Sequence, residues 1–154
     1  MIATDLYYPE ELPNAQREGH GMEAVSPFSR TAMDSGRSRS RPRFTSVPTM
    51  ATFNWKFTDQ QALMFESWFR DTINNGSAWF NIKYKTPLGM SLLVCKFATM
   101  YKGPILLPLN RWGFSATMEV WERPLLAPGW GNFPEFIRFA DIIDLAMNRE
   151  WPEA

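Results

Sequence analysis

The chain has 154 residues, 45% of them apolar, which favours a single domain built around one hydrophobic core. Its 16 Lys and Arg residues balance 16 Asp and Glu residues, so the formal charge is zero; this excludes a strongly basic nucleic-acid-binding protein and makes any charge argument local. Aromatic residues make up 15% of the chain, a proportion unlike that of a disordered protein.

The first 49 residues predict an extended arm, because they are rich in proline and show no helical apolar period. The charge of this arm changes sign along its length. Before residue 25 the net charge is −4, from one Arg17 against Asp5, Glu10, Glu11, Glu18 and Glu23. Over residues 26–49 the net charge is +4, from one Asp34 against Arg30, Arg37, Arg39, Arg41 and Arg43. The two halves are complementary and could pair within one chain or between neighbouring copies.

Regular signals begin at Met50 and continue to about residue 123, which predicts an antiparallel β domain with one helix. Apolar residues alternate with polar ones over residues 51–57, the period of a strand with one buried face. Thr58 and Gln61 have the spacing of a capping box, which predicts a helix over 59–73. Phe65 and Phe69 lie on the apolar stripe of that helix, the face that we expect to be buried. The sequence Asn74-Asn-Gly-Ser77 is typical of a helix end.

Three further strands are expected after this helix. Residues 78–84 and 91–98 alternate around a Pro- and Gly-containing turn and predict a hairpin. A loop follows, and residues 112–121 then give the clearest alternation of the chain. In this reading Trp55 and Trp112 belong to the core, whereas Trp79 and Trp121 lie on mixed faces and are candidates for an interface.

Residues 124–154 predict a Pro- and Gly-rich linker and a C-terminal amphipathic helix over about 134–149. Its apolar stripe is formed by Phe136, Phe139, Ala140, Ile143, Ala146 and Met147. The arm and this tail cannot form a core alone, so we expect them to pack on something else, such as an adjacent subunit. The whole chain is therefore expected to be α+β: an antiparallel sheet of sandwich or barrel type with one packed helix, an N-terminal arm and a C-terminal helix.

Residues suited to catalysis are few. The single cysteine, Cys95, excludes an intrachain disulfide framework and a multi-cysteine zinc site, and its place in a strand favours a small core filler. The single histidine, His20, lies in the arm, and the carboxylate pairs Glu10-Glu11 and Asp141/Asp144 fit solvated charges. We therefore expect no enzyme, no cofactor and no bound metal. No apolar run has the length of a membrane span, so we also expect no membrane span and no secretory leader.

The run Arg37-Ser-Arg-Ser-Arg-Pro-Arg43 is the sharpest local feature of the chain. In an extended conformation its four arginines, Arg37, Arg39, Arg41 and Arg43, project on one side about 7 Å apart. Such a row could pair with acidic residues of a neighbour, contact nucleic-acid phosphates or form a plain solvated face. The first of these is the interpretation we favour.

The order of these elements resembles that of small tail structural proteins of tailed bacteriophages, namely the minor tail protein M and distal tail protein families with their tail-tube type of domain. The resemblance covers about residues 25–125, including the Ser35-Gly-Arg-Ser-Arg39 segment. It is carried by Phe53-Asn-Trp-Lys-Phe57, Gln61-Ala-Leu-Met-Phe-Glu-Ser-Trp-Phe69, Gly76-Ser-Ala-Trp-Phe80, Lys85-Thr-Pro-Leu-Gly89 and Trp112 to Glu122.

The resemblance implies a structural virion subunit, made in the host cytoplasm, that assembles into a ring of the tail tube, tail tip or baseplate. Its expected partners are copies of itself and other tail proteins, with transient contact to DNA in the channel. A small nucleic-acid-binding module that uses Arg37 to Arg43 is the alternative.

Overall fold

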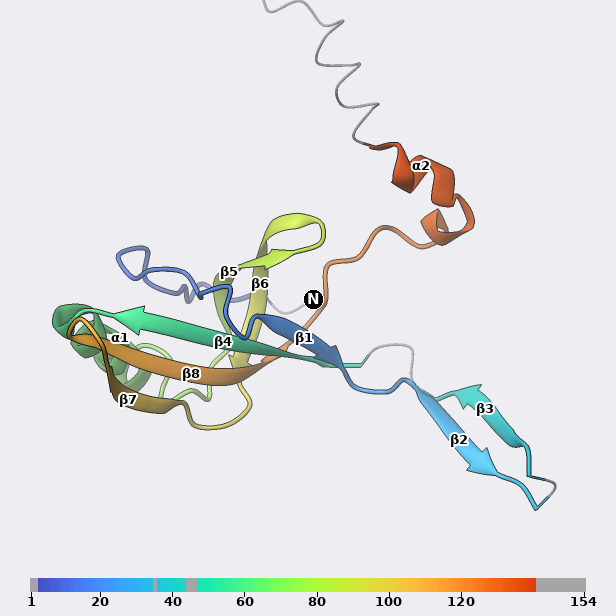
Figure 1. Cartoon of the computed structure of the whole chain (residues 1–154), viewed down its shortest axis with the longest axis horizontal. Coiled ribbons are helices and arrows are strands. Elements are labelled where there is room, and N and C mark those ends of the chain that lie inside the picture. The colour runs from blue at the N-terminus through green and yellow to red at the C-terminus, as the bar shows by residue number, and fades with distance from the viewer. Residues whose placement is uncertain (1–2, 35, 44–46, 141–154) are drawn as a thin grey trace, which may run out of the picture. The chain divides into compact units, whose positions relative to one another are not determined.

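The structure is a computed structural model that describes residues 3–34, 36–43 and 47–140 and divides into two units, 1–124 and 125–154. The elements of the first unit, in chain order, are β1 (Gly21–Ala24), β2 (Phe28–Ala32), β3 (Ser38–Pro42), β4 (Thr49–Phe57), α1 (Asp59–Asp71), β5 (Phe80–Thr86), β6 (Gly89–Phe97), β7 (Lys102–Leu107) and β8 (Arg111–Val120) (Figure 1). The second unit contains the 3-10 turn η1 (Trp130–Asn132) and the short helix α2 (Pro134–Arg138).

One six-stranded antiparallel sheet organises the first unit, with β1, β4, β8, β6 and β5 in this order and β7 also paired to β8. The longest ladder joins β4 to β8, from Thr49 opposite Val120 to Phe57 opposite Trp112. The sheet is open, and β2 and β3 form a separate two-stranded hairpin. The predicted α+β class with an antiparallel sheet and one packed helix is confirmed.

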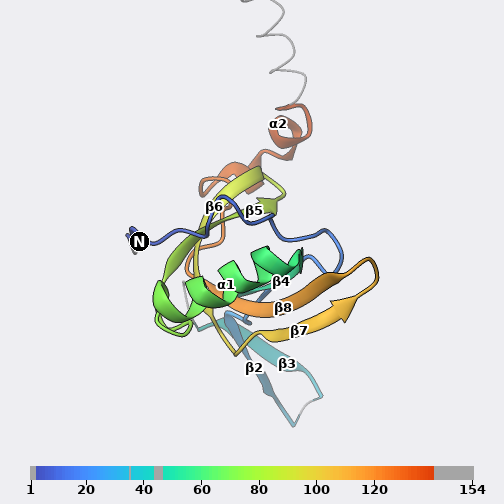
Figure 2. The same cartoon turned by 90° about the vertical axis from the view of Figure 1, so that its left-hand side faces the viewer.

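The core lies between this sheet and α1, because the alternation expected from the sequence directs one face of each strand inward. Phe53, Trp55 and Phe57 of β4 are fully or almost fully buried. Phe65 of α1 meets this face, with its ring 5.4 Å from Trp55 and 5.1 Å from Phe114. Figure 2 shows α1 lying against β4 and β8.

Helix α1 begins with the predicted capping box. The Thr58 hydroxyl accepts from the Gln61 amide at 3.4 Å, and the Gln61 side chain accepts from the Thr58 amide at 3.0 Å. The helix ends at Asp71, two residues before the expected end, and Asn74, Asn75 and Gly76 follow with positive φ. At Gly76 a Cβ would lie only 2.9 Å from the Phe69 ring, so the position also needs the absence of a side chain.

The N-terminal segment (residues 3–20) is more ordered than the expected extended arm. Tyr8 and Leu12 are buried in the core of their own chain, and Tyr8 stacks on Trp55 with centroids 6.2 Å apart. Further along, the backbone forms β1, β2 and β3, none of which was predicted. Tyr8 and Leu12 therefore pack on something outside the segment, as expected, and what they pack on is the core of their own chain rather than an adjacent subunit.

Strand β7 lies where a loop was expected. It pairs with the first half of β8, Leu106 opposite Trp112, with a register shift between Lys102 and Ile105. Gly103 and Pro104 lie within β7, and both residue types are typical of loops, so the sequence pattern does not predict a strand there. An edge strand with a bulge tolerates both residues because one side of it needs no ladder hydrogen bonds.

The second unit carries an apolar cluster of its own. Trp130, Phe133 and Phe136 are 46 to 57% exposed and line a shallow pocket with Pro128 and Gly129. The α-helix α2 spans five residues of the predicted 134–149 helix. Asp141, Ile143, Asp144, Ala146 and Met147 lie outside the described residues. Within the part of the chain that is described, no helix is long and apolar enough to cross a membrane.

Candidate interaction surface

The arginine row is carried by the β2–β3 hairpin. In the antiparallel register Arg39 lies opposite Thr31, and Arg41 lies opposite Ser29. Because side chains alternate along a strand and paired residues share a face, Arg39 and Arg41 lie on one face with Ser29 and Thr31. The other face carries Arg30, whose Nε donates to the Ser38 hydroxyl at 2.8 Å.

Arg37 and Arg43 flank β3 at the next alternate positions, and their backbones help to close the hairpin. The Met33 amide donates to the Arg37 carbonyl at 3.1 Å, and the Arg43 amide donates to the Pro27 carbonyl at 2.8 Å. The structure therefore brings all four predicted arginines into one hairpin. Arg39 and Arg41 form the centre of a cationic face, which we define as Arg37, Arg39, Arg41 and Arg43.

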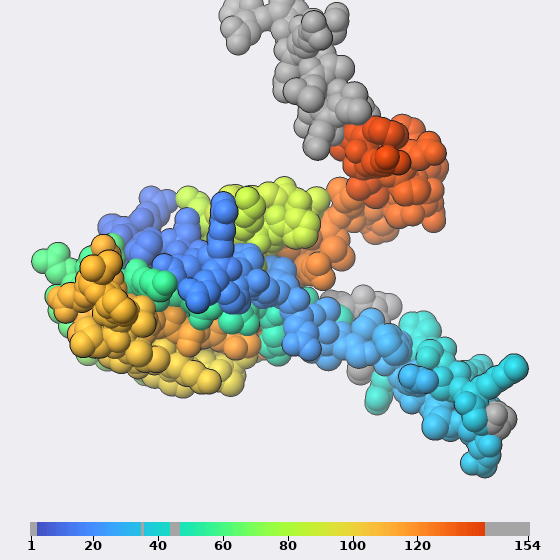
Figure 3. Space-filling model, in the orientation of Figure 1, coloured from blue at the N-terminus to red at the C-terminus, as the bar shows by residue number. Residues whose placement is uncertain are grey.

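The hairpin has no core. Every residue of β2 and β3 is exposed except the half-buried Ser29. Figure 3 shows the visible side of this hairpin, in light blue to cyan, uncovered by other described residues. An isolated two-stranded hairpin is only marginally stable in water, so a second surface that packs on it would stabilise it.

The charge of three of the four arginines of the cationic face is not balanced locally. The ion pairs of the described residues join Lys56 to Glu18, Arg70 to Asp71 and Lys96 to Glu119. Within those residues Arg37, Arg39 and Arg41 form no ion pair. A guanidinium presents a planar fork of donors that suits carboxylates and phosphates, so this face is built to meet an anionic surface.

Trp79 and Trp121 form a second cluster that the sequence did not place together. Their rings meet edge to face at 5.3 Å, and the Lys96 ammonium lies 4.7 Å from the Trp79 centroid. Lys96 also pairs with Glu119 at 3.4 Å. Trp121 is 40% exposed and Trp79 is partly buried, so both reach the surface as expected. The contact joins residues distant in sequence, which a local pattern cannot reveal.

The other predicted core tryptophan, Trp112, is only partly buried. Its indole nitrogen donates to the Asp59 carboxylate at 2.6 Å, at the start of α1. Trp55 is in the core as predicted, at 1% exposure. Trp112 differs because it stands at the end of the β4–β8 ladder, where a polar atom of the ring can reach the helix.

Cys95 and His20 have separate partners. The Cys95 thiol is fully buried and lies 3.6 Å from the Met118 sulfur, and burial raises its pKa. His20 stacks on Tyr84 and donates from Nε2 to the Lys85 carbonyl at 2.8 Å. Among the described residues no group of His, Cys, Asp and Glu has the arrangement of a metal site.

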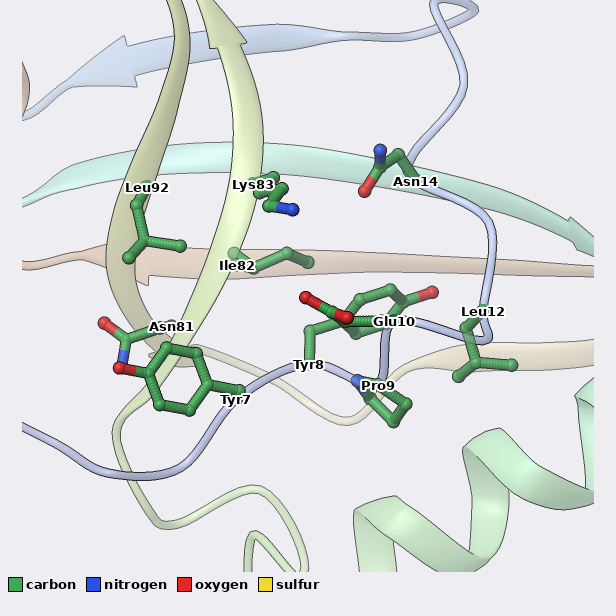
Figure 4. Close-up of a pocket in the computed structure, with 10 residues that line it drawn as sticks. All are labelled: Tyr7, Tyr8, Pro9, Glu10, Leu12, Asn14, Asn81, Ile82, Lys83 and Leu92. Atoms are coloured by element: carbon green, nitrogen blue, oxygen red, sulfur yellow. The ribbon is translucent and has the colours of Figure 1, made fainter.

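A pocket of about 450 Å³ lies between the N-terminal segment and β5 (Figure 4). Tyr7, Glu10 and Asn14 line it from the N-terminal segment, and Asn81 and Lys83 line it from β5. Asn81 is engaged structurally, because its side-chain amide donates to the carbonyls of residues 4 and 6 at 2.7 and 3.2 Å. The pocket is thus a groove beside a structural hydrogen-bond network.

Comparison with protein-family models, with curated proteins and with solved structures finds no match for this chain.

Proposed function

We propose that the chain is a structural, non-enzymatic component of a bacteriophage virion that assembles into a ring of the tail tube, tail tip or baseplate. The observation that carries this proposal is the β2–β3 hairpin, an exposed extension on a well-packed body. Such an element contributes little to the stability of one chain and much to contact between chains. A subunit of this kind works in the tail of the virion after synthesis in the host cytoplasm.

The edges of the sheet support assembly. Among the described residues, strand β7 pairs with β8 alone, and its Ile105 and Leu106 are 56% and 61% exposed. Exposed apolar edge strands favour association, which is a liability for a monomer and useful in a closed ring. The contacts of a ring are heterologous, so each copy needs two different surfaces, an extension and a surface that receives it.

The second unit supports contact with further tail proteins. Its exposed aromatic residues, Trp130, Phe133 and Phe136, resemble the anchors of protein interfaces in residue type and exposure. An aromatic segment of this kind, joined through the Pro- and Gly-containing residues 124–129, suits a role as a second adhesive extension.

Mass photometry of the purified full-length chain, at low and high salt and with and without DNA, tests the proposal. We expect a discrete oligomer that forms without nucleic acid, and closed rings when that oligomer is imaged by electron microscopy. A chain that stays monomeric across the whole concentration and salt range would contradict the proposal.

The alternative function is a small nucleic-acid-binding module that uses the cationic face. The observation in its favour is that Arg37, Arg39, Arg41 and Arg43 lie on one exposed β-ribbon, an element that some proteins place in a groove of DNA. Phosphate contacts release counterions, so this function predicts an affinity for free DNA that falls steeply with salt. A monomer that binds DNA with such a salt dependence would favour the alternative.

A further inference from the structure

On the β2–β3 hairpin, Arg39 and Arg41 form no ion pair among the described residues, and the chain itself carries the matching negative charge. Residues 26–49 have a net charge of +4, residues 1–24 have a net charge of −4, and the whole chain is neutral. Complementary charges of this size on two surfaces steer association and fix its register.

The acidic residues are held on an ordered surface. Glu10 and Glu11 occupy a turn that is closed by a hydrogen bond from the Leu12 amide to the Pro9 carbonyl at 3.2 Å. Burial of Leu12 anchors the end of this turn in the core. The backbone that carries the two carboxylates is therefore held in place, which lowers the entropy that a partner must remove on binding.

Glu10 and Glu11 are also available to a partner. Both are exposed, and neither forms an ion pair within the described residues. Glu18 differs, because it pairs with Lys56 at 3.6 Å. Asp5 is also exposed and without an ion pair among the described residues, but the turn of Glu10 and Glu11 is where two such carboxylates are adjacent.

The face of the hairpin suits carboxylates better than nucleic-acid bases. The residues that share the face with Arg39 and Arg41 are Ser29 and Thr31, which are short and polar. Phe28 and Pro42 lie on the opposite face by the same register. Proteins that bind single-stranded nucleic acid add aromatic stacking surfaces to their positive charge, and this face has none among its described residues.

We propose that the hairpin of one copy docks through Arg39 and Arg41 on the Glu10–Glu11 turn of the next copy. This inference rests on the proposed ring function and names the two surfaces that meet in it. Guanidinium groups bind carboxylates through paired, charge-assisted hydrogen bonds, which give the contact direction as well as attraction. Repetition of one such heterologous contact generates a ring or an open chain.

Two charge reversals test the contact. The first variant carries Arg39→Glu and Arg41→Glu, and the second carries Glu10→Arg and Glu11→Arg. Each juxtaposes like charges at the contact, so we expect the concentration at half assembly to rise by about tenfold or more for each variant alone. A variant with Lys56→Glu and Arg70→Glu makes the same charge change as the first at exposed positions of β4 and α1, outside the two proposed surfaces and the β7 edge, and should assemble as wild type does.

Mixing the two variants gives the decisive result. In a one-to-one mixture every contact between unlike copies is again complementary, so assembly should return, as it should in a single chain that carries all four reversals. Circular dichroism melting should give the same midpoint for every variant, because all of the altered side chains are exposed. Mass photometry reads the assembly in each case.

The remaining outcomes overturn the proposal in distinguishable ways. Assembly of both variants at the wild-type concentration would contradict the contact and leave the ring function intact. Failure of the mixture to recover would exclude pairing between copies. Loss of DNA binding in the Arg39→Glu and Arg41→Glu variant, with unchanged assembly, would assign the face to nucleic acid. A wild-type chain that never assembles would contradict both the contact and the ring function.

Discussion

His20 and Tyr84 stack face to face, with ring centroids 3.9 Å apart and an angle of 15° between the planes. The Tyr84 hydroxyl also lies 3.0 Å from the carbonyl of Gly21 and 3.1 Å from that of Thr52, as a donor to both. Tyr84 therefore links β5, at one end of the strand order, to β1 at the other end and to β4 beside it. The open sheet is held in a curled shape by side chains rather than by a continuous ladder.

Removal of the Tyr84 hydroxyl should weaken this link. Tyr84→Phe keeps the ring that stacks on His20 and removes the donor to the two carbonyls, so we expect a loss of about 0.5–1.5 kcal/mol in the free energy of unfolding. Urea denaturation measures the change. Tyr7→Phe is the matched control, because Tyr7 is 57% exposed. An equal effect of both substitutions would show that the link does not contribute to stability.

Phe65 is expected to be the most sensitive residue of α1. Its side chain is fully buried, and its ring contacts those of Trp55, Phe57 and Phe114. Phe65→Ala should cost about 3–5 kcal/mol through lost burial and the cavity left behind. Thermal melting of Phe65→Ala beside Leu63→Ala, a position 66% exposed, measures the difference. An unchanged melting temperature for Phe65→Ala would contradict the assignment of this face to the core.

The elements that could be predicted from the sequence are those whose pattern lies within the element itself. In β4 and β8 the residues alternate over nine and ten positions, and at α1 the capping box lies within four residues. Strands β1, β2 and β3 have four or five residues and few apolar ones, so their pairing depends on partners rather than on a period.

The candidate site was only partly predictable for the same reason. The alternate spacing of Arg37 to Arg43 was visible in the sequence, and the structure places it on an exposed face. The pairing of β3 with β2 was not visible, because Ser29, Arg30 and Thr31 give β2 no apolar face. The meeting of Trp79 with Trp121 depends on how β6 and β8 bring distant residues together.

Leu12 tests whether the N-terminal segment belongs to the fold of its own chain. The residue is 4% exposed within the core cluster, so Leu12→Ala should lower the free energy of unfolding by about 2–5 kcal/mol. Glu11→Ala, at the exposed neighbouring position, should have little effect. Chemical denaturation at low protein concentration, where the chain is monomeric, measures both. Equal stability of the two variants would indicate that the segment packs only in an assembly.

Cys95 should be unreactive in the folded protein. Thiol reagents attack the thiolate, and burial both raises the pKa of this thiol and blocks access to it. At about pH 8 we expect Ellman's reagent to label the native chain at the rate of global unfolding, and the urea-unfolded chain at once. Rapid labelling of the native chain would reveal an accessible nucleophile and reopen the question of catalysis.

Substitution of Arg39 and Arg41 should weaken assembly without changing the stability of the fold. Both side chains are exposed on a hairpin without a core, so replacing both with Ser should change the free energy of unfolding by less than about 0.5 kcal/mol each. The same double substitution removes half of the cationic face and should weaken assembly. The matched control is Arg70→Ser, which removes an exposed arginine from the last turn of α1. Mass photometry measures assembly and thermal melting measures stability on the same samples. A fall in melting temperature together with unchanged assembly would show that the arginines stabilise the fold and do not form the contact between copies.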